Sequence, residues 1–150
     1  MATVDVADLV RDGRVETVTP DLAAAWSRID EAKTHLASSA VLANTDPALA
    51  YVALYDAARK AISAHMQAHG YRATNRAGAH QAIGLYAEAV LATGAGVPHI
   101  RAFDRMRQIR NRSEYSQQPI TPQLLTTDLG HAKGIVAAAE AELPPRPSMS

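Results

Sequence analysis

The chain contains no cysteine, which excludes disulfide bonds, thiolate metal sites and a cysteine nucleophile together. Aromatic residues are scarce, with one tryptophan, one phenylalanine and five tyrosines. No apolar run approaches the roughly 18 residues needed to cross a bilayer, and the first residues lack the basic segment and apolar core of a secretion signal. The sequence therefore predicts a cytoplasmic protein without a membrane segment.

An excess of one charge is also missing. Lys and Arg total 15, as do Asp and Glu, so the formal net charge is zero and no global field attracts nucleic acid or an anionic membrane. Any site for a polyanion must therefore be local. The 150 residues fit one domain with one hydrophobic core. Because alanine dominates and few large side chains fill that core, oligomerisation would help to stabilise it.

Apolar residues recur at steps of three and four in five segments, which is the pattern of amphipathic helices. Asp46-Pro47 and Thr121-Pro122 each place a capping side chain before a proline at the first helical position. No strand-like alternation interrupts the segments, so the sequence predicts an all-α antiparallel bundle of five main helices. The expected helices span about residues 20–43, 47–69, 78–92, 98–115 and 122–143.

The ends of the chain are expected to differ from this bundle. Residues 1–19 are short, mixed in character and interrupted by Gly13, which predicts an N-terminal arm or a short helix. Residues 144–150 contain three prolines and cannot continue a helix, so they are expected to form a disordered tail. The bundle itself is expected to occupy residues 20–143.

The segment from Arg101 to Tyr115 concentrates positive charge on one predicted helix. Its arginines outnumber the acidic residues Asp104 and Glu114 by three. Guanidinium groups remain charged and match phosphate or carboxylate oxygens as planar forks, so this segment predicts phosphate or carboxylate recognition. The five arginines are Arg101, Arg105, Arg107, Arg110 and Arg112.

Helical spacing brings several of these side chains together. Arg107, Arg110 and Glu114 lie on one face at steps of three and four, and Asn111 and Tyr115 form the adjacent row. The face can therefore serve as a binding site. The alternative is a salt-bridged stripe in which Arg110 pairs with Glu114 and Tyr115 closes the core.

Parts of the sequence resemble a HEPN (higher eukaryotes and prokaryotes nucleotide-binding) domain. The resemblance covers about residues 21–143, and the pattern from Phe103 to Tyr115 is similar to that of an actinobacterial branch. The parts that carry it are residues 56–60 and 64–70 on one long helix, the connection from Asn75-Arg76 to His80, and Arg110-Asn111 near the end of a later helix.

The resemblance implies a helical domain that forms a homodimer, and in many relatives a metal-independent ribonuclease at the dimer interface. Those enzymes carry an Arg-x4-6-His motif, in which the arginine stabilises charge on the scissile phosphate and the histidine assists proton transfer. Arg110 and Asn111 match the first two positions, whereas Tyr115 stands at the position of the histidine. An unperturbed tyrosine, with a pKa of about 10, is a poor base at cellular pH, although it can donate a hydrogen bond.

The predicted catalytic residues are therefore Arg110, Asn111 and Tyr115, and the predicted binding residues are Arg105, Arg107, Arg112 and Glu114. We expect binding of RNA or a nucleotide phosphate, with weak or lost ribonuclease activity, in a toxin, defence or stress system that includes a partner protein or antitoxin. No cofactor is expected. The alternative function is a non-catalytic protein-interaction or adaptor module.

The histidines offer two further readings. His65 and His69 are four residues apart and can share one helical face, but the glutamate and third ligand of a zinc-protease pattern are not evident, so no metal site is predicted. His80 and His99 begin two of the expected helices and could replace the motif histidine in space. No spacing argument supports either one.

Overall fold

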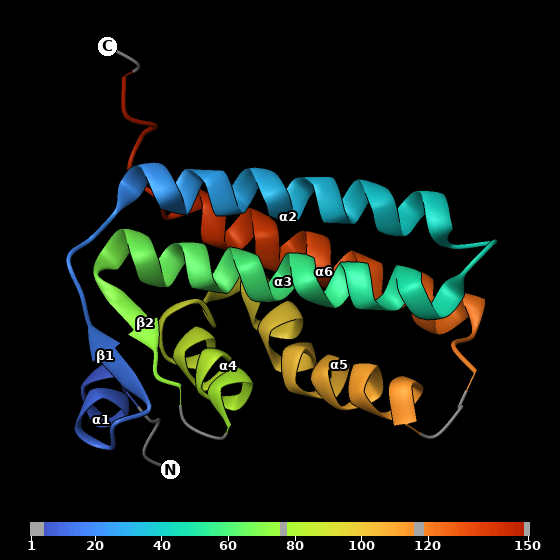
Figure 1. Ribbon diagram of the computed structural model, residues 1–150, viewed down its shortest axis with the longest axis horizontal. Helices are drawn as coiled ribbons and strands as arrows, with labels where there is room; N and C mark the ends of the chain where they lie inside the picture. The colour runs from blue at the N-terminus through green and yellow to red at the C-terminus, as the bar shows by residue number, and fades with distance from the viewer. Residues whose placement is uncertain (1–4, 76–77, 116–118, 149–150) are drawn as a thin grey trace.

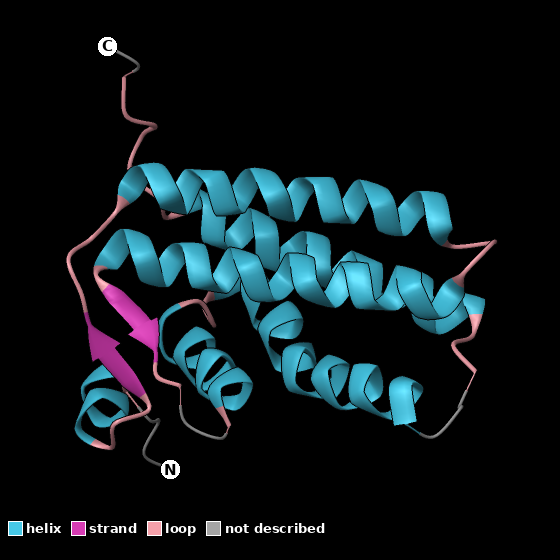
Figure 2. Ribbon diagram, in the orientation of Figure 1, coloured by secondary structure: helices cyan, strands magenta, loops and turns pink. Residues whose placement is uncertain are grey.

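The computed structural model describes residues 5–75, 78–115 and 119–148, which are mostly helical (Figures 1 and 2). Within these ranges, no helix combines the length and hydrophobicity required to span a membrane. The elements follow in the order α1 (Val6–Arg11), β1 (Val15–Thr17), α2 (Leu22–Leu42), α3 (Pro47–His69), β2 (Tyr71–Ala73), α4 (Ala79–Val90), the 3₁₀ turn η1 (Gly94–Gly96), α5 (Val97–Tyr115) and α6 (Pro122–Ala141).

Helix α3 is the centre of the structure. It lies beside α2 and α6 along its length and also contacts α4 and α5 (Figure 1). Tyr51, Leu54 and Tyr55 are fully buried on it, and buried alanines before and after them on the same helix leave room for neighbouring helices to approach. The apolar character of this segment on nearly all sides, visible in the sequence, is thus explained by contacts on several sides.

The predicted start signals of two helices are confirmed. The Asp46 carboxylate accepts a hydrogen bond from the backbone N–H of Leu49 at 3.1 Å, and Pro47 begins α3. The Thr121 hydroxyl caps α6 through the N–H of Leu124, also at 3.1 Å. At the other end of α3, Gly70 adopts a left-handed conformation with φ of 86°, which an L side chain rarely adopts.

The mostly helical structure agrees with the predicted all-α class, and it adds a small sheet that the sequence did not indicate. Strands β1 and β2 form a small antiparallel sheet in which Val15 lies opposite Ala73 and Thr17 opposite Tyr71 (Figure 2). Each strand has three residues, too few to produce a recognisable alternation of polar and apolar positions. The sheet joins the N-terminal region, which contains the short helix α1, to the end of α3.

Helix α4 approaches α5 closely at Gly84, which has no side chain. A Cβ atom added at Gly84 would lie 3.3 Å from the Phe103 ring, so glycine permits this approach. One turn before Gly84 is His80, and one and two turns after Phe103 are Arg107 and Arg110. The close packing therefore brings the beginning of α4 next to the arginine-bearing face of α5.

Residues 144–146 lie against α2. The Trp26 indole N–H donates to the Pro144 carbonyl oxygen at 2.9 Å. Arg146 binds both carboxylate oxygens of Asp30, at 3.0 and 2.6 Å, and its guanidinium carbon lies 4.5 Å from the centre of the Trp26 ring. The sequence predicts a disordered tail over residues 144–150, whereas the structure gives its first part specific contacts.

Candidate functional site

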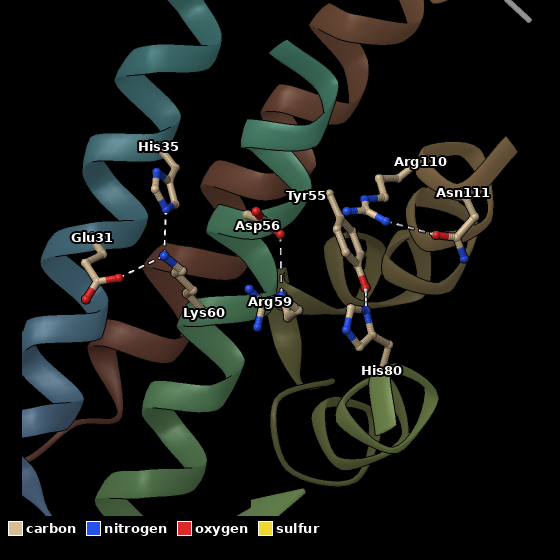
Figure 3. A network of polar contacts seen from close by, with 9 residues as sticks. All are labelled: Glu31, His35, Tyr55, Asp56, Arg59, Lys60, His80, Arg110 and Asn111. Atoms are coloured by element: carbon tan, nitrogen blue, oxygen red, sulfur yellow. Dashed lines mark hydrogen bonds and ion pairs between the residues drawn. The ribbon is translucent and has the colours of Figure 1, made fainter. Parts of the chain in front are cut away.

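Three helices bring basic side chains to one place. Arg59 comes from the middle of α3, His80 from the first turn of α4, and Arg107 and Arg110 from the second half of α5. We call these four residues the arginine–histidine cluster. Figure 3 shows Arg59, His80 and Arg110 arranged around the side chain of Tyr55, which rises from α3 between α4 and α5.

Tyr55 and His80 form the centre of this site. The Tyr55 hydroxyl lies 2.9 Å from His80 Nδ1 (Figure 3), and the two rings are roughly parallel, with their centres 6.0 Å apart. The Tyr55 ring also stacks against the Phe103 ring, with the ring centres 5.4 Å apart. Burial raises the pKa of Tyr55 to about 12, although the nearby guanidinium groups oppose this rise. The hydroxyl therefore keeps its proton at neutral pH.

The pKa of His80 is shifted in the opposite direction. Desolvation of the ring lowers it, and the positive charges of Arg59, Arg110 and Arg107 lower it further, while Asp56 acts against them. The imidazole is consequently neutral at pH 7.

Neighbouring side chains on the same helices hold the three arginines. The contacts are Arg59 with Asp56 at 3.5 Å, Arg107 with Asp104 at 3.0 Å, and Arg110 with the Asn111 side-chain oxygen at 3.4 Å. The first two are ion pairs between partly exposed side chains, so they orient the guanidinium groups at a small energetic gain. Each of the three guanidinium groups thus has at least one contact with a side chain of its own helix.

The structure brings together some of the predicted site residues and separates others. Arg107, Arg110 and Asn111 lie within about one turn of α5, and Arg110 contacts Asn111. Arg105 instead forms an ion pair with Asp128 of α6 at 2.6 Å, and Asp128 is fully buried and also accepts a hydrogen bond from Tyr51 at 2.7 Å. Arg105 thus contacts the α3–α6 core rather than the cluster.

The remaining predicted residues lie at the end of α5. Arg112 is exposed in the last turns of the helix. The side chains of Glu114 and Tyr115 lie outside the described part of the chain, as does Arg76 of the connection to His80. The alternative pairing of Arg110 with Glu114 and the role of Tyr115 therefore stay predictions.

Two contributors to the site, Tyr55 and Arg59, were not identified from the sequence as site residues. Arg59 belongs to the segment 56–60 that carries part of the family resemblance, but Tyr55 has the spacing of an ordinary core residue. His80 was considered because it ends the connection that carries part of the resemblance and begins a helix, but no spacing argument supported it. None of the three is close in sequence to the arginine-rich segment, so only the packing of α3, α4 and α5 reveals the cluster.

A separate network surrounds His65. Its Nδ1 lies 2.8 Å from the Tyr86 hydroxyl and its Nε2 lies 2.7 Å from Glu142, while its ring stacks on His69 with the centres 4.1 Å apart. Both ring nitrogens are thus engaged with protein groups. Among the described residues, no group of three or more histidine, cysteine or acidic side chains could hold a metal ion.

Comparisons of the chain with protein-family models, with curated proteins and with solved structures give no match. The geometry and electrostatics of the arginine–histidine cluster are therefore the basis for the function proposed below.

Proposed function

We propose that the arginine–histidine cluster binds phosphate groups of single-stranded RNA. The observation that carries this proposal is the arrangement of Arg59, His80 and Arg110 around Tyr55 (Figure 3), with Arg107 one turn before Arg110 on α5. The lowered pKa of His80 favours its neutral form. Guanidinium groups provide charge and paired N–H donors for phosphate oxygens. A neutral imidazole can add a hydrogen bond without adding to the repulsion among the three cations.

The charge distribution sets an expectation for the affinity. Since the chain has no net charge, attraction to RNA comes from this local cluster and extends over few phosphates. For two or three neutralised phosphates on a single strand, the logarithm of the binding constant should fall with the logarithm of salt concentration with a slope of about −2. All of the groups come from one chain, so binding does not require the homodimer that the family resemblance implies.

Binding can be tested by fluorescence anisotropy with a labelled single-stranded RNA at two salt concentrations. We expect Arg110→Ala to weaken binding about tenfold, since it removes charge-assisted hydrogen bonds, and to reduce the salt slope by about one. Arg101→Ala is the matched control. Arg101 is an exposed arginine of the same helix and lies about two turns before Arg107. Its affinity should stay within about twofold of wild type.

Equal and negligible affinity of wild type and Arg110→Ala for RNA would refute the proposal and favour the alternative of a protein-interaction or adaptor module. Equal losses in Arg110→Ala and Arg101→Ala would also contradict it, because they would indicate attraction by total charge rather than by the cluster.

The position of His80 extends the proposal to weak metal-independent ribonuclease activity. His80 lies in space beside Arg110, where it can replace the histidine that the motif lacks at Tyr115 in the transfer of a proton to or from a bound phosphodiester. The same RNA, incubated with EDTA and separated on a denaturing gel, provides this second readout. Cleavage by wild type that is lost in His80→Ala would support it, and cleavage that persists in His80→Ala would exclude His80 as the proton-transfer group.

A further inference from the structure

We infer that Tyr55 is a positioning residue, whose hydroxyl holds His80 in the tautomer with its proton on Nε2, so that His80 presents a hydrogen-bond donor to a phosphate bound by the arginines. The part of this inference that concerns phosphate binding rests on the proposed function. The part that concerns the hydrogen bond between Tyr55 and His80 can be observed without any ligand.

The direction of the hydrogen bond follows from the burial of Tyr55. The tyrosine is fully buried, and a buried hydroxyl is stabilised when its proton has an acceptor. Within the described part of the chain, His80 Nδ1 at 2.9 Å is the one hydrogen-bond partner of this hydroxyl. If Nδ1 carried the proton and donated it to the tyrosine oxygen, the hydroxyl proton of Tyr55 would itself have no acceptor. The hydroxyl therefore donates and Nδ1 accepts.

An accepting Nδ1 determines the state of the other ring nitrogen. In a neutral imidazole, one nitrogen carries the proton and the other accepts, so acceptance at Nδ1 places the proton of His80 on Nε2. The guanidinium charges that lower the pKa of His80 favour this neutral form over the imidazolium. Stacking of Tyr55 between His80 and Phe103 fixes the orientation of the hydroxyl. The contact with Tyr55 thus determines both the ring orientation and the tautomer of His80.

The tautomer decides how His80 meets an anion. With the proton on Nε2, the exposed side of the imidazole donates to a phosphate oxygen. In the other tautomer, Nε2 would direct a lone pair at the same oxygen, and the contact would be repulsive. The arginines attract the phosphate in either case, but only the Nε2–H tautomer adds a neutral donor to them.

The chain offers a matched control in the second tyrosine–histidine pair. Tyr86 lies 2.8 Å from Nδ1 of His65, and Tyr86 is as buried as Tyr55. Tyr55→Phe and Tyr86→Phe each remove one hydroxyl and keep the ring. They differ in which histidine loses its Nδ1 partner, so an effect confined to His80 separates positioning from a general consequence of removing a buried hydroxyl.

The tautomer can be measured by long-range nitrogen–proton correlation NMR on the full chain labelled with ¹⁵N at pH 7.5, with His80→Gln identifying the His80 signals. We expect wild-type His80 to carry its proton on Nε2, and Tyr55→Phe to show a mixture of both tautomers. Titration with inorganic phosphate should perturb His80 in wild type, with an affinity about threefold to tenfold lower in Tyr55→Phe. Tyr86→Phe should leave both the His80 tautomer and the phosphate affinity unchanged.

The possible failures are distinguishable. The inference would be overturned if wild-type His80 carried its proton on Nδ1. It would also be overturned if Tyr55→Phe gave a folded spectrum in which the His80 tautomer was unchanged. Neither result would exclude phosphate binding. A tautomer that changes as expected in a protein that binds neither phosphate nor RNA would refute the proposed function, and with it the role of the Nε2 proton in phosphate binding.

Discussion

Two tyrosine–histidine pairs share the same hydrogen bond between a hydroxyl and Nδ1, yet their surroundings differ. His65 is buried, and its second nitrogen contacts Glu142 at 2.7 Å. His80 is exposed, its second nitrogen has no hydrogen-bond partner among the described residues, and its neighbours are cationic. The first pair is a closed network in which each polar atom is satisfied by protein, whereas the second leaves one polar atom for a ligand.

The difference shows how one local arrangement can serve two purposes. A network completed by protein groups fixes how helices pack and has nothing left to offer a ligand. A network with one open position, placed among charges, has the features of a binding site. The two pairs have similar distances and the same residue types. They differ in what lies at the second nitrogen of the histidine, which contacts Glu142 in His65.

The largest expected effect is on stability. His65→Ala removes a buried ring and leaves the Tyr86 hydroxyl without its partner, so we expect the free energy of unfolding to fall by about 2–4 kcal/mol. His80→Ala truncates an exposed side chain, so it loses little packing, but it leaves the buried Tyr55 hydroxyl without its partner and should cost about 1–2 kcal/mol. Urea denaturation followed by circular dichroism measures both. Equal losses for the two variants would mean that the pairs do not differ in structural importance.

A smaller effect is expected from pH. Burial lowers the pKa of His65 below its ordinary value, although its hydrogen bond to Glu142 opposes this. A depressed histidine pKa means that the unfolded chain takes up the proton first, so stability is fully present above about pH 6.5 and declines as the pH falls below it, by at most about 1.4 kcal/mol per pH unit for one proton. The lowered pKa of His80 acts in the same direction.

Denaturation at pH 5.5 and pH 7.5 tests this. Wild type should lose about 1 kcal/mol at the lower pH, and His65→Gln should lose less, because the buried titrating group is gone. His80→Gln should resemble wild type more closely, since solvent reduces the contribution of an exposed ring. The exposed carboxylates Asp8, Asp30 and Glu31 have lowered pKa values and titrate below this window. A loss that is the same in wild type and His65→Gln would exclude His65 as its source.

The smallest effect concerns the group that closes the first network. Glu142 has nearly half of its side chain exposed, so Glu142→Gln, which keeps an acceptor for the His65 Nε2 proton, should reduce stability by only about 0.5 kcal/mol. Thermal denaturation at pH 7.5 would measure the change. A loss as large as that of His65→Ala would show that the charge of Glu142, rather than the imidazole, maintains the network.

Much of the helical structure could be predicted from the sequence because its signals are local. Asp46-Pro47 and Thr121-Pro122 cap helices through side chains three residues from their partners, and Gly70 ends α3 through its own backbone conformation. The small sheet could not be predicted in this way. Its strands are three residues long. They pair although the whole of α2 and α3 lies between them in the sequence, so no local pattern marks either strand.

The candidate site was predictable to the extent that it lies on one helix. Arg107, Arg110 and Asn111 are neighbours because helical spacing makes them so. Arg105 follows the same charge pattern, but its position on the helix turns it toward Asp128 on α6. The association of Tyr55 and His80 depends on the packing of α4 against α5, where Gly84 meets Phe103. No short motif in the sequence indicates that contact.

The docking of residues 144–146 on α2 has a consequence for spectroscopy. Trp26 is the sole tryptophan, and both its indole N–H and the face of its ring are covered by that segment. Its fluorescence emission therefore reports detachment of the C-terminal segment as well as melting of the helices. A shift of emission that precedes the loss of ellipticity would identify release of this segment as a separate, earlier step, whose midpoint should move with ionic strength because Arg146 and Asp30 attract each other through exposed charges.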